Sequence, residues 1–161
     1  MKNIFKEYIS YVLIIVAVIL VRTFIVTPVR VNGRSMVDTL LEGDIMILNK
    51  LGDIKRESIV VVDKAVDGSR LIKRVIGLPG ESIKCVDGDI YINDEVYDDK
   101  YAYGITLDFD TVELQDDEYF VMGDNRVVSE DSRYFGPVKE KYLLGTTRLI
   151  LFPFKRIGIV K

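Results

Sequence analysis

The sequence of 161 residues contains no histidine and only one cysteine, Cys85. These two absences remove the usual ligands of zinc and haem, and a single thiol excludes an internal disulfide. Cys85 also lacks the histidine that would make it a thiolate nucleophile, so its place in an apolar alternating run predicts a small buried strand residue. We therefore expect no metal and no cofactor.

The chain also lacks a strong excess of positive or negative charge. The chain has 22 lysines and arginines against 25 aspartates and glutamates, a net charge of −3. This balance gives no reason to expect nucleic-acid binding. The length suits one domain with a real core and is too short for two.

One long hydrophobic run stands at the N-terminus. Residues 8–26 are almost purely apolar, and as a helix they would extend about 28 Å, the thickness of a bilayer core. Neither a cleaved signal peptide nor a buried core helix fits as well, because no small-x-small pair follows the run and every face is apolar. Lys2 and Lys6 favour a cytoplasmic tail. We predict that residues 1–27 are a tail and an uncleaved transmembrane anchor in the plasma membrane, with residues 28–161 on its extracytoplasmic face.

After the anchor, short β-branched runs alternate with turn residues. Asp87-Gly88 is the best hairpin signal. The pattern predicts one β domain of packed antiparallel sheets, with residues 82–118 as a ribbon or loop extension and a single short helical turn near 139–144. The expected strands are 45–48, 58–62, 71–76, 82–86, 90–93, 119–122 and 148–152.

Ser35 lies on a glycine-led turn where a nucleophile could sit, but histidine is not available as its base. A lysine serves if it is held neutral. With an unperturbed pKa near 10.4, a lysine is only about 0.1% neutral at pH 7.4, and lowering its pKa by two to three units requires burial. Lys73 fits best, because it stands in an apolar strand. The alternative is that Lys73 is the outward residue of an alternating strand.

Residues 123–137 form a third segment, dense in charged and hydroxyl side chains between two apolar strands. Such a segment is often a solvated loop. It can also supply a hydroxyl to a lysine amine, while internally paired Asp–Arg contacts hold the loop rigid.

Taken together, these segments resemble the bacterial type I signal peptidases, which are serine peptidases with a Ser/Lys dyad. The resemblance covers nearly the whole chain. The matching pieces are residues 33–40, 42–44, 73–81 and 123–138.

The resemblance implies a role for each matching position. Ser35 would be the nucleophile, Lys73 the general base, and Ser129 the hydroxyl that orients the amine. The backbone at Ser35 and Gly33 would form the oxyanion hole. The supporting residues would be Asp124, Arg126, Asp131 and Arg133; the residues that line shallow pockets for small side chains would be Val29, Val31, Met36, Leu40 and Ile72.

The implied activity is cleavage of signal peptides from exported preproteins after Ala-x-Ala, through an acyl-enzyme. Its partners would be signal peptides, bound by strand addition, and the lipid bilayer. One position departs from the family, since Asp38 stands where proline is usual, and its carboxylate could retain a proton on a nearby lysine. Two alternatives remain: a self-cleaving repressor relative, which would need a DNA-binding module, and a catalytically impaired membrane-tethered β module that binds peptides or partners.

Overall fold

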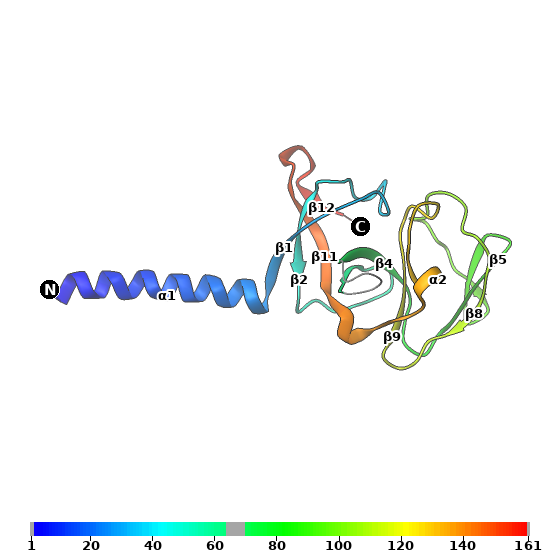
Figure 1. The fold of residues 1–161 in the computed structure, drawn as a ribbon, viewed down its shortest axis with the longest axis horizontal. Coiled ribbons are helices and arrows are strands. Elements are labelled where there is room, and N and C mark those ends of the chain that lie inside the picture. The colour runs from blue at the N-terminus through cyan, green and yellow to red at the C-terminus, as the bar shows by residue number, and fades with distance from the viewer. Residues whose placement is uncertain (1, 64–69, 161) are drawn as a thin grey trace.

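The computed structural model describes residues 2–63 and 70–160. Helix α1, Lys2–Phe24, projects from one end of a β body (Figure 1). The chain then passes at once into β1, Val26–Arg30. The predicted anchor therefore ends two residues too late, because Val26 already pairs with Asn49 of the neighbouring strand.

The other elements are mostly short strands. They are β2 (Ile45–Asn49), β3 (Ile59–Val62), β4 (Leu71–Gly77), β5 (Ser82–Val86), β6 (Asp89–Ile92), β7 (Glu95–Val96), β8 (Phe109–Glu113), β9 (Glu118–Met122), α2 (Ser132–Phe135), β10 (Val138–Lys139), η1 (Glu140–Tyr142), β11 (Leu143–Phe152), η2 (Phe154–Arg156) and β12 (Gly158–Ile159). The site described below is carried by β4, by the turn between β1 and β2, and by the segment that follows β9.

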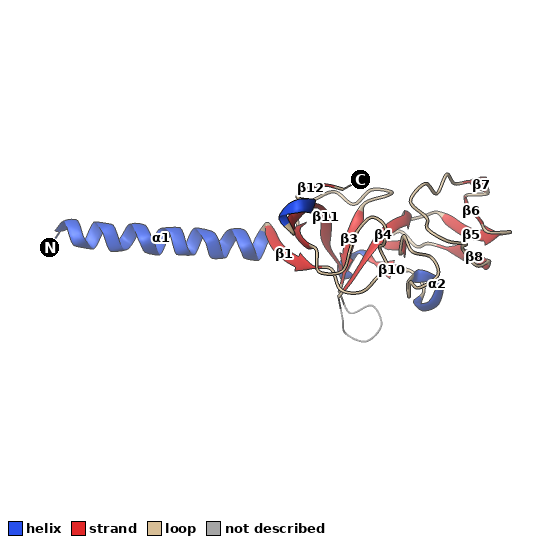
Figure 2. Ribbon diagram, turned by 90° about the horizontal axis from the view of Figure 1, so that it is seen from above, coloured by secondary structure: helices blue, strands red, loops and turns tan. Residues whose placement is uncertain are grey.

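Two antiparallel sheets make up the body. The larger has eight strands in the order β1-β2-β11-β3-β4-β9-β10, with β12 paired to β11. Pro28 is tolerated in β1 because this strand is at the edge and a proline there removes no inner hydrogen bond. The smaller sheet, β7-β6-β5-β8, lies at the far end of the body from α1 (Figure 2).

The hairpin prediction is confirmed. Val86 pairs with Asp89, so Asp87 and Gly88 form a two-residue loop between β5 and β6. Both have positive φ, 54° and 87°, as a type I′ turn requires. Cys85 is a buried residue of β5, as expected, and burial, with the nearby Asp108 carboxylate, raises the pKa of its thiol.

The smaller sheet is part of the same domain, because it shares a hydrophobic core with the larger one. Ile83, Ile90 and Ile92 of the smaller sheet pack against Ile76 and Phe120 of the larger. The extension predicted over residues 82–118 is therefore a packed sheet with a long loop. Its strand β8 was not predicted, since the sequence of Phe109–Glu113 is mostly polar and exposed on one face.

Apolar side chains are exposed at both ends of the chain. Within residues 2–63 and 70–160, no helix meets the length and apolarity that a membrane span requires. The predicted transmembrane span is therefore not confirmed. At the other end of the chain, Phe152 and Phe154 lie outside the core: they are 46% and 78% exposed, and their rings pack edge to face.

Candidate active site

The turn between β1 and β2 holds Ser35 in a half-buried position. Its ends are joined because the Val31 N–H donates to Asp44 O at 2.8 Å and the Gly43 N–H to Val31 O at 2.9 Å. Gly33 has φ of 81°, a conformation that glycine adopts without strain. In the part of the chain that the structure describes, the Ser35 N–H donates to no acceptor.

Thr39 anchors this turn from two sides. Its hydroxyl donates to the Asp124 carboxylate at 2.5 Å, and its carbonyl accepts from Arg156 at 3.3 Å. Arg156 also donates to both oxygens of the buried Asp44, at 3.1 and 3.0 Å. The Ser35 turn is therefore fixed by the segment that follows β9 and by the C-terminal turn η2.

Lys73 lies near the middle of β4 and is only 2% exposed. The interpretation of this lysine as an outward strand residue is therefore wrong, because the strand is covered on both faces. In the β4–β9 pairing Arg74 faces Met122 and Val75 faces Val121. If this register is continued by one position, Lys73 comes opposite Gly123, the residue that follows β9.

Gly123 lies where the segments that carry Ser35 and Ser129 meet. A Cβ at this position would overlap Ser129 Oγ and would come within 2.5 Å of the Ser35 carbonyl oxygen. The Asn125 N–H, two residues on, donates to that same carbonyl at 3.0 Å. The missing side chain of Gly123 therefore leaves the room in which the segments of Ser35 and Ser129 approach the Lys73 strand.

Ser129 has the properties expected of a group that awaits a partner. Its side chain is buried, and among the described residues its hydroxyl reaches no partner at full hydrogen-bond geometry, although it lies close enough to the Asp131 carboxylate to lower the pKa of that group. A buried hydroxyl without a partner costs roughly 1–3 kcal/mol. Such a cost is tolerated at a site where the partner is a group that changes its protonation or position during a reaction.

Burial lowers the pKa of Lys73 from 10.5 to about 8. Desolvation is the largest cause, because it disfavours the charged ammonium. Asp131 opposes it most, Arg133 assists it, and Glu130 and Asp124 oppose it more weakly. Asp38 is exposed and is not among these four charges, so the structure does not support the expectation that Asp38 holds a proton on the lysine.

Each nearby buried carboxylate is already paired with an arginine. Asp131 receives two hydrogen bonds of 2.8 Å from Arg133 and one of 2.9 Å from the Gly123 N–H. Burial would raise the pKa of Asp131, but these hydrogen bonds outweigh it and lower the pKa. Asp131 therefore stays ionised and committed to Arg133, and its charge on Lys73 is partly cancelled.

Asp124 has a comparable partner in Arg74, the residue after the candidate base. Arg74 Nε and Nη2 donate to the two carboxylate oxygens at 2.8 and 2.7 Å, and both side chains are fully buried. The ring of Tyr101 covers the guanidinium at 3.7 Å, within the range of a cation–π contact.

The predicted support residues were thus only partly assigned correctly. Asp131 and Arg133 pair within the segment, as expected. Asp124 pairs with Arg74, and Arg126 pairs with Asp99. Arg126 is tied to the site through its 3.0 Å hydrogen bond to Gly123 O, so it connects the long loop of residues 97–108 to the turn at 123.

The residues predicted to line substrate pockets fall into one hydrophobic group. We call this group the substrate cluster: Val29, Val31, Met36, Leu40 and Ile72. Val31, Met36 and Leu40 are buried, with Leu40 fully so, and these three form its floor. Val29 and Ile72 are the members that keep exposed surface.

Sequence reasoning did not assign a role to Arg74, Thr39, Arg156 or Tyr101. Arg74 carried a usable signal, since a strand made of apolar residues buries an arginine only when the arginine has a partner. Nothing local marks Arg156, whose contacts lie 112 and 117 positions away.

Comparison with known proteins agrees with this geometry. A family model described as signal peptidase, peptidase S26, matches residues 4–152. Signal peptidase I of Bacillus licheniformis is 35% identical, and the alignment covers 97% of this chain and 93% of that protein. Signal peptidase I of Streptococcus pneumoniae is 30% identical, with 98% and 97% covered.

A solved structure shows the same likeness. The crystal structure of a signal peptidase I from Enterococcus faecalis V583 is 34% identical to this chain, with a TM-score of 0.54 over 58% of this chain and 96% of that one. These similarities define the protein as a serine endopeptidase. The chain belongs to the signal peptidase family, peptidase S26.

Proposed function

We propose that the protein cleaves signal peptides from exported preproteins after small residues, in the pattern Ala-x-Ala, with Ser35 as nucleophile and Lys73 as general base. The observation that carries this proposal is the state of Lys73, which is buried, has a pKa of about 8, and by continuation of the β4–β9 register comes opposite the glycine that the Ser35 and Ser129 segments approach. At pH 8 about half of such an amine is neutral, against well under 1% for an unperturbed lysine.

The proposed reaction has two steps. Neutral Lys73 takes the Ser35 proton as Oγ attacks the scissile carbonyl, and the ammonium then protonates the leaving amine as the acyl-enzyme forms. The same amine, neutral again, takes a proton from the water that releases the acyl group. The free N–H of Ser35 stabilises the oxyanion in both steps, and the Ser129 hydroxyl aligns the amine by accepting a hydrogen bond from it.

Selectivity for small residues follows from the substrate cluster. Its floor is closed by buried side chains, so only a short side chain at the cleavage site can enter without overlap. Val29 lies on an edge strand, which can pair with an extended substrate by strand addition.

We also propose that α1 holds the enzyme at the plasma membrane, with its N-terminus in the cytoplasm and the β body outside. The support is the surface of the helix: its apolar side chains from Tyr8 to Phe24 are exposed to the extent of 44–67%. An exposed apolar surface of this size marks an interaction site. Its test is sedimentation with membranes, where removal of residues 1–24 should move the protein to the soluble fraction.

The catalytic proposal is tested with a purified preprotein that carries an Ala-x-Ala site. Ser35→Ala and Lys73→Ala should each lower kcat/KM by at least about 10³-fold, because the two residues act as a unit. Lys84→Ala is the matched control, since Lys84 is a half-buried strand lysine in the smaller sheet. Wild-type turnover by either site variant would refute the assigned dyad, and equal turnover by all three would favour a peptide-binding module.

A further inference from the structure

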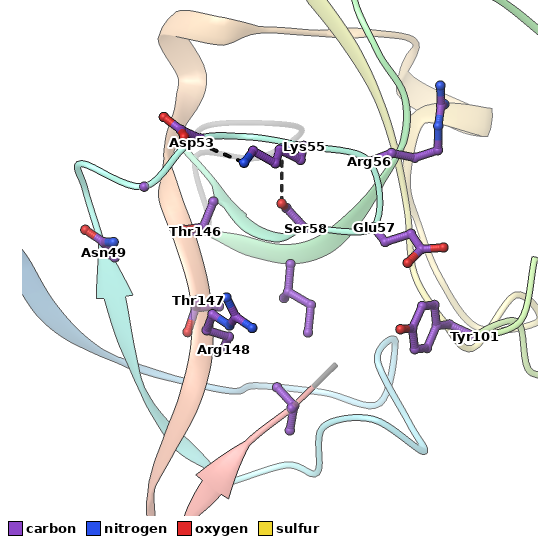
Figure 3. A pocket seen from close by; sticks show the side chains of 13 residues that line it. Asn49, Asp53, Lys55, Arg56, Glu57, Ser58, Tyr101, Thr146, Thr147 and Arg148 are labelled. Atoms are coloured by element: carbon purple, nitrogen blue, oxygen red, sulfur yellow. Dashed lines mark hydrogen bonds and ion pairs between the residues drawn. The ribbon is translucent and has the colours of Figure 1, made fainter.

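A polar cavity of about 610 Å³ lies beside the candidate active site (Figure 3). Its walls come from β11, from the loop between β2 and β3, and from the long loop that contains Tyr101. The charged members are Asp53, Lys55, Arg56, Glu57 and Arg148. The cavity therefore differs in character from the apolar substrate cluster.

The polar cavity shares walls with the site already described. Ile59 and Val160 line it and also pack in the same hydrophobic group as Val29 and Ile72. Tyr101 lines it and covers Arg74, the neighbour of Lys73. The cavity thus borders the substrate cluster. An extended peptide advances about 3.3 Å per residue, so a peptide bound along the substrate cluster can continue into the cavity.

The carboxylates of the polar cavity already have cations. Glu57 is held by Lys100 at 2.9 Å, and Asp53 lies 3.8 Å from Lys55. Arg56 in turn donates two hydrogen bonds to the Glu81 carboxylate, of 3.0 and 2.5 Å. These pairs balance the negative charges of the lining, so the net charge that remains there is the positive charge of Arg148.

Arg148 is the cation that remains. Among the described residues its guanidinium forms no ion pair. It stands on β11, where the pairing with β2 shifts between Thr147 and Leu149, and Figure 3 shows its side chain on the β11 wall of the cavity. Ser58 and Thr146 add hydroxyl groups to the same lining.

We propose that the polar cavity is a subsite for an acidic side chain of the substrate, four to six residues before the scissile bond, and that Arg148 recognises it. This inference rests on the proposed function. Arg148 acts through charge on a side chain remote from the reacting bond, so it sets preference among substrates and leaves the chemical step unchanged.

The test uses the full chain and a set of peptides with a constant Ala-x-Ala site and Glu, Gln or Lys at each of these upstream positions. For the wild type, kcat/KM should favour Glu over Lys by about fivefold at one position, the size expected of a partly exposed charge pair. Arg148→Gln should remove the preference and Arg148→Glu should reverse it, while cleavage of the Gln peptide stays unchanged.

Lys141→Glu is the matched control, because Lys141 is an exposed cation on η1, outside the cavity. It should keep the wild-type preference, and a reversal by this variant as well would show that net charge alone is responsible and overturn the subsite. The subsite is also overturned if wild type and Arg148→Glu cut all the peptides at equal rates. Failure to cut any peptide overturns the proposed function instead, and this inference with it.

Discussion

Two neighbouring cations lie on opposite faces of β4 and have contrasting surroundings. Lys73 and Arg74 are adjacent and both buried, and their side chains project to opposite sides of the strand. Arg74 donates two hydrogen bonds to the Asp124 carboxylate and one of 2.8 Å to the backbone carbonyl of Glu57. The face of an aromatic ring also covers its guanidinium. Lys73 lies near carboxylates that arginines have already bound.

This difference matches the chemistry of the two side chains. A guanidinium keeps its charge in a protein, so a buried arginine must be fully paired. An ammonium can lose its proton, so a buried lysine without a partner becomes a neutral base. The Arg74 face therefore stabilises the fold, the Lys73 face carries the proposed base, and this contrast can be tested from each side.

The largest effect on stability is expected from breaking the Arg74 face. Arg74→Met should lower the free energy of unfolding by about 3–5 kcal/mol, because it leaves the buried Asp124 carboxylate without its counter-ion. Denaturant unfolding at pH 7 measures the change. The variant Arg74→Met with Asp124→Leu should recover part of the loss, whereas no recovery would show that the pair is not the source.

A change in stability of the opposite sign is expected when Lys73 is replaced. Lys73→Met should raise the free energy of unfolding at pH 7 by up to about 3 kcal/mol, since the pKa in the folded protein is about 8 against 10.5 unfolded. Below pH 8 the wild type carries the full cost of a buried ammonium. As the pH rises from 8 to 10.5 that cost disappears, so the advantage of the variant should shrink over this range. A pH-independent difference would contradict the assignment.

A smaller effect should come from the turn that holds Ser35. Arg156→Met removes the contacts to Asp44 and Thr39 and should lower kcat about tenfold with little change in KM, because a misplaced nucleophile loses its alignment. Lys155→Met, on the same short turn, is the control. Equal kcat values for the two variants would show that Arg156 does not position Ser35.

The smallest effect concerns one exposed charge. Glu130 raises the pKa of Lys73, so Glu130→Gln should move the alkaline rise of kcat/KM to lower pH by a few tenths of a unit, as an exposed and screened charge allows. Glu140→Gln, on η1, should leave the profile unchanged. A shift of the profile to higher pH in Glu130→Gln would have the wrong sign.

How much the sequence could predict depended on the range of the interaction. Strands with β-branched runs and the Asp87-Gly88 hairpin were predictable because periodicity and turn chemistry are local. β8 was not, since its strand has few apolar residues and is defined by pairing with β5. Lys73 could be chosen from its apolar neighbours alone, because burial is the main cause of its lowered pKa.

The pairing of the charges could not be predicted in the same way. Asp124, Arg126, Asp131 and Arg133 are close in sequence, and two intra-segment pairs were the simplest expectation. Only Asp131–Arg133 forms within the segment. Asp124 reaches 50 residues back to Arg74, and such choices depend on which strands lie side by side.

The most direct test of the account is the pKa of the Lys73 amine, measured in the full chain by NMR titration of lysines labelled with ¹³C at Cε, with Lys73→Met to assign the signal. The account predicts a midpoint near 8 for this lysine and the same midpoint in the pH dependence of kcat/KM. A midpoint above 10 would contradict it, since at most about 0.1% of the amine would then be neutral at pH 7, against roughly a tenth for a midpoint of 8.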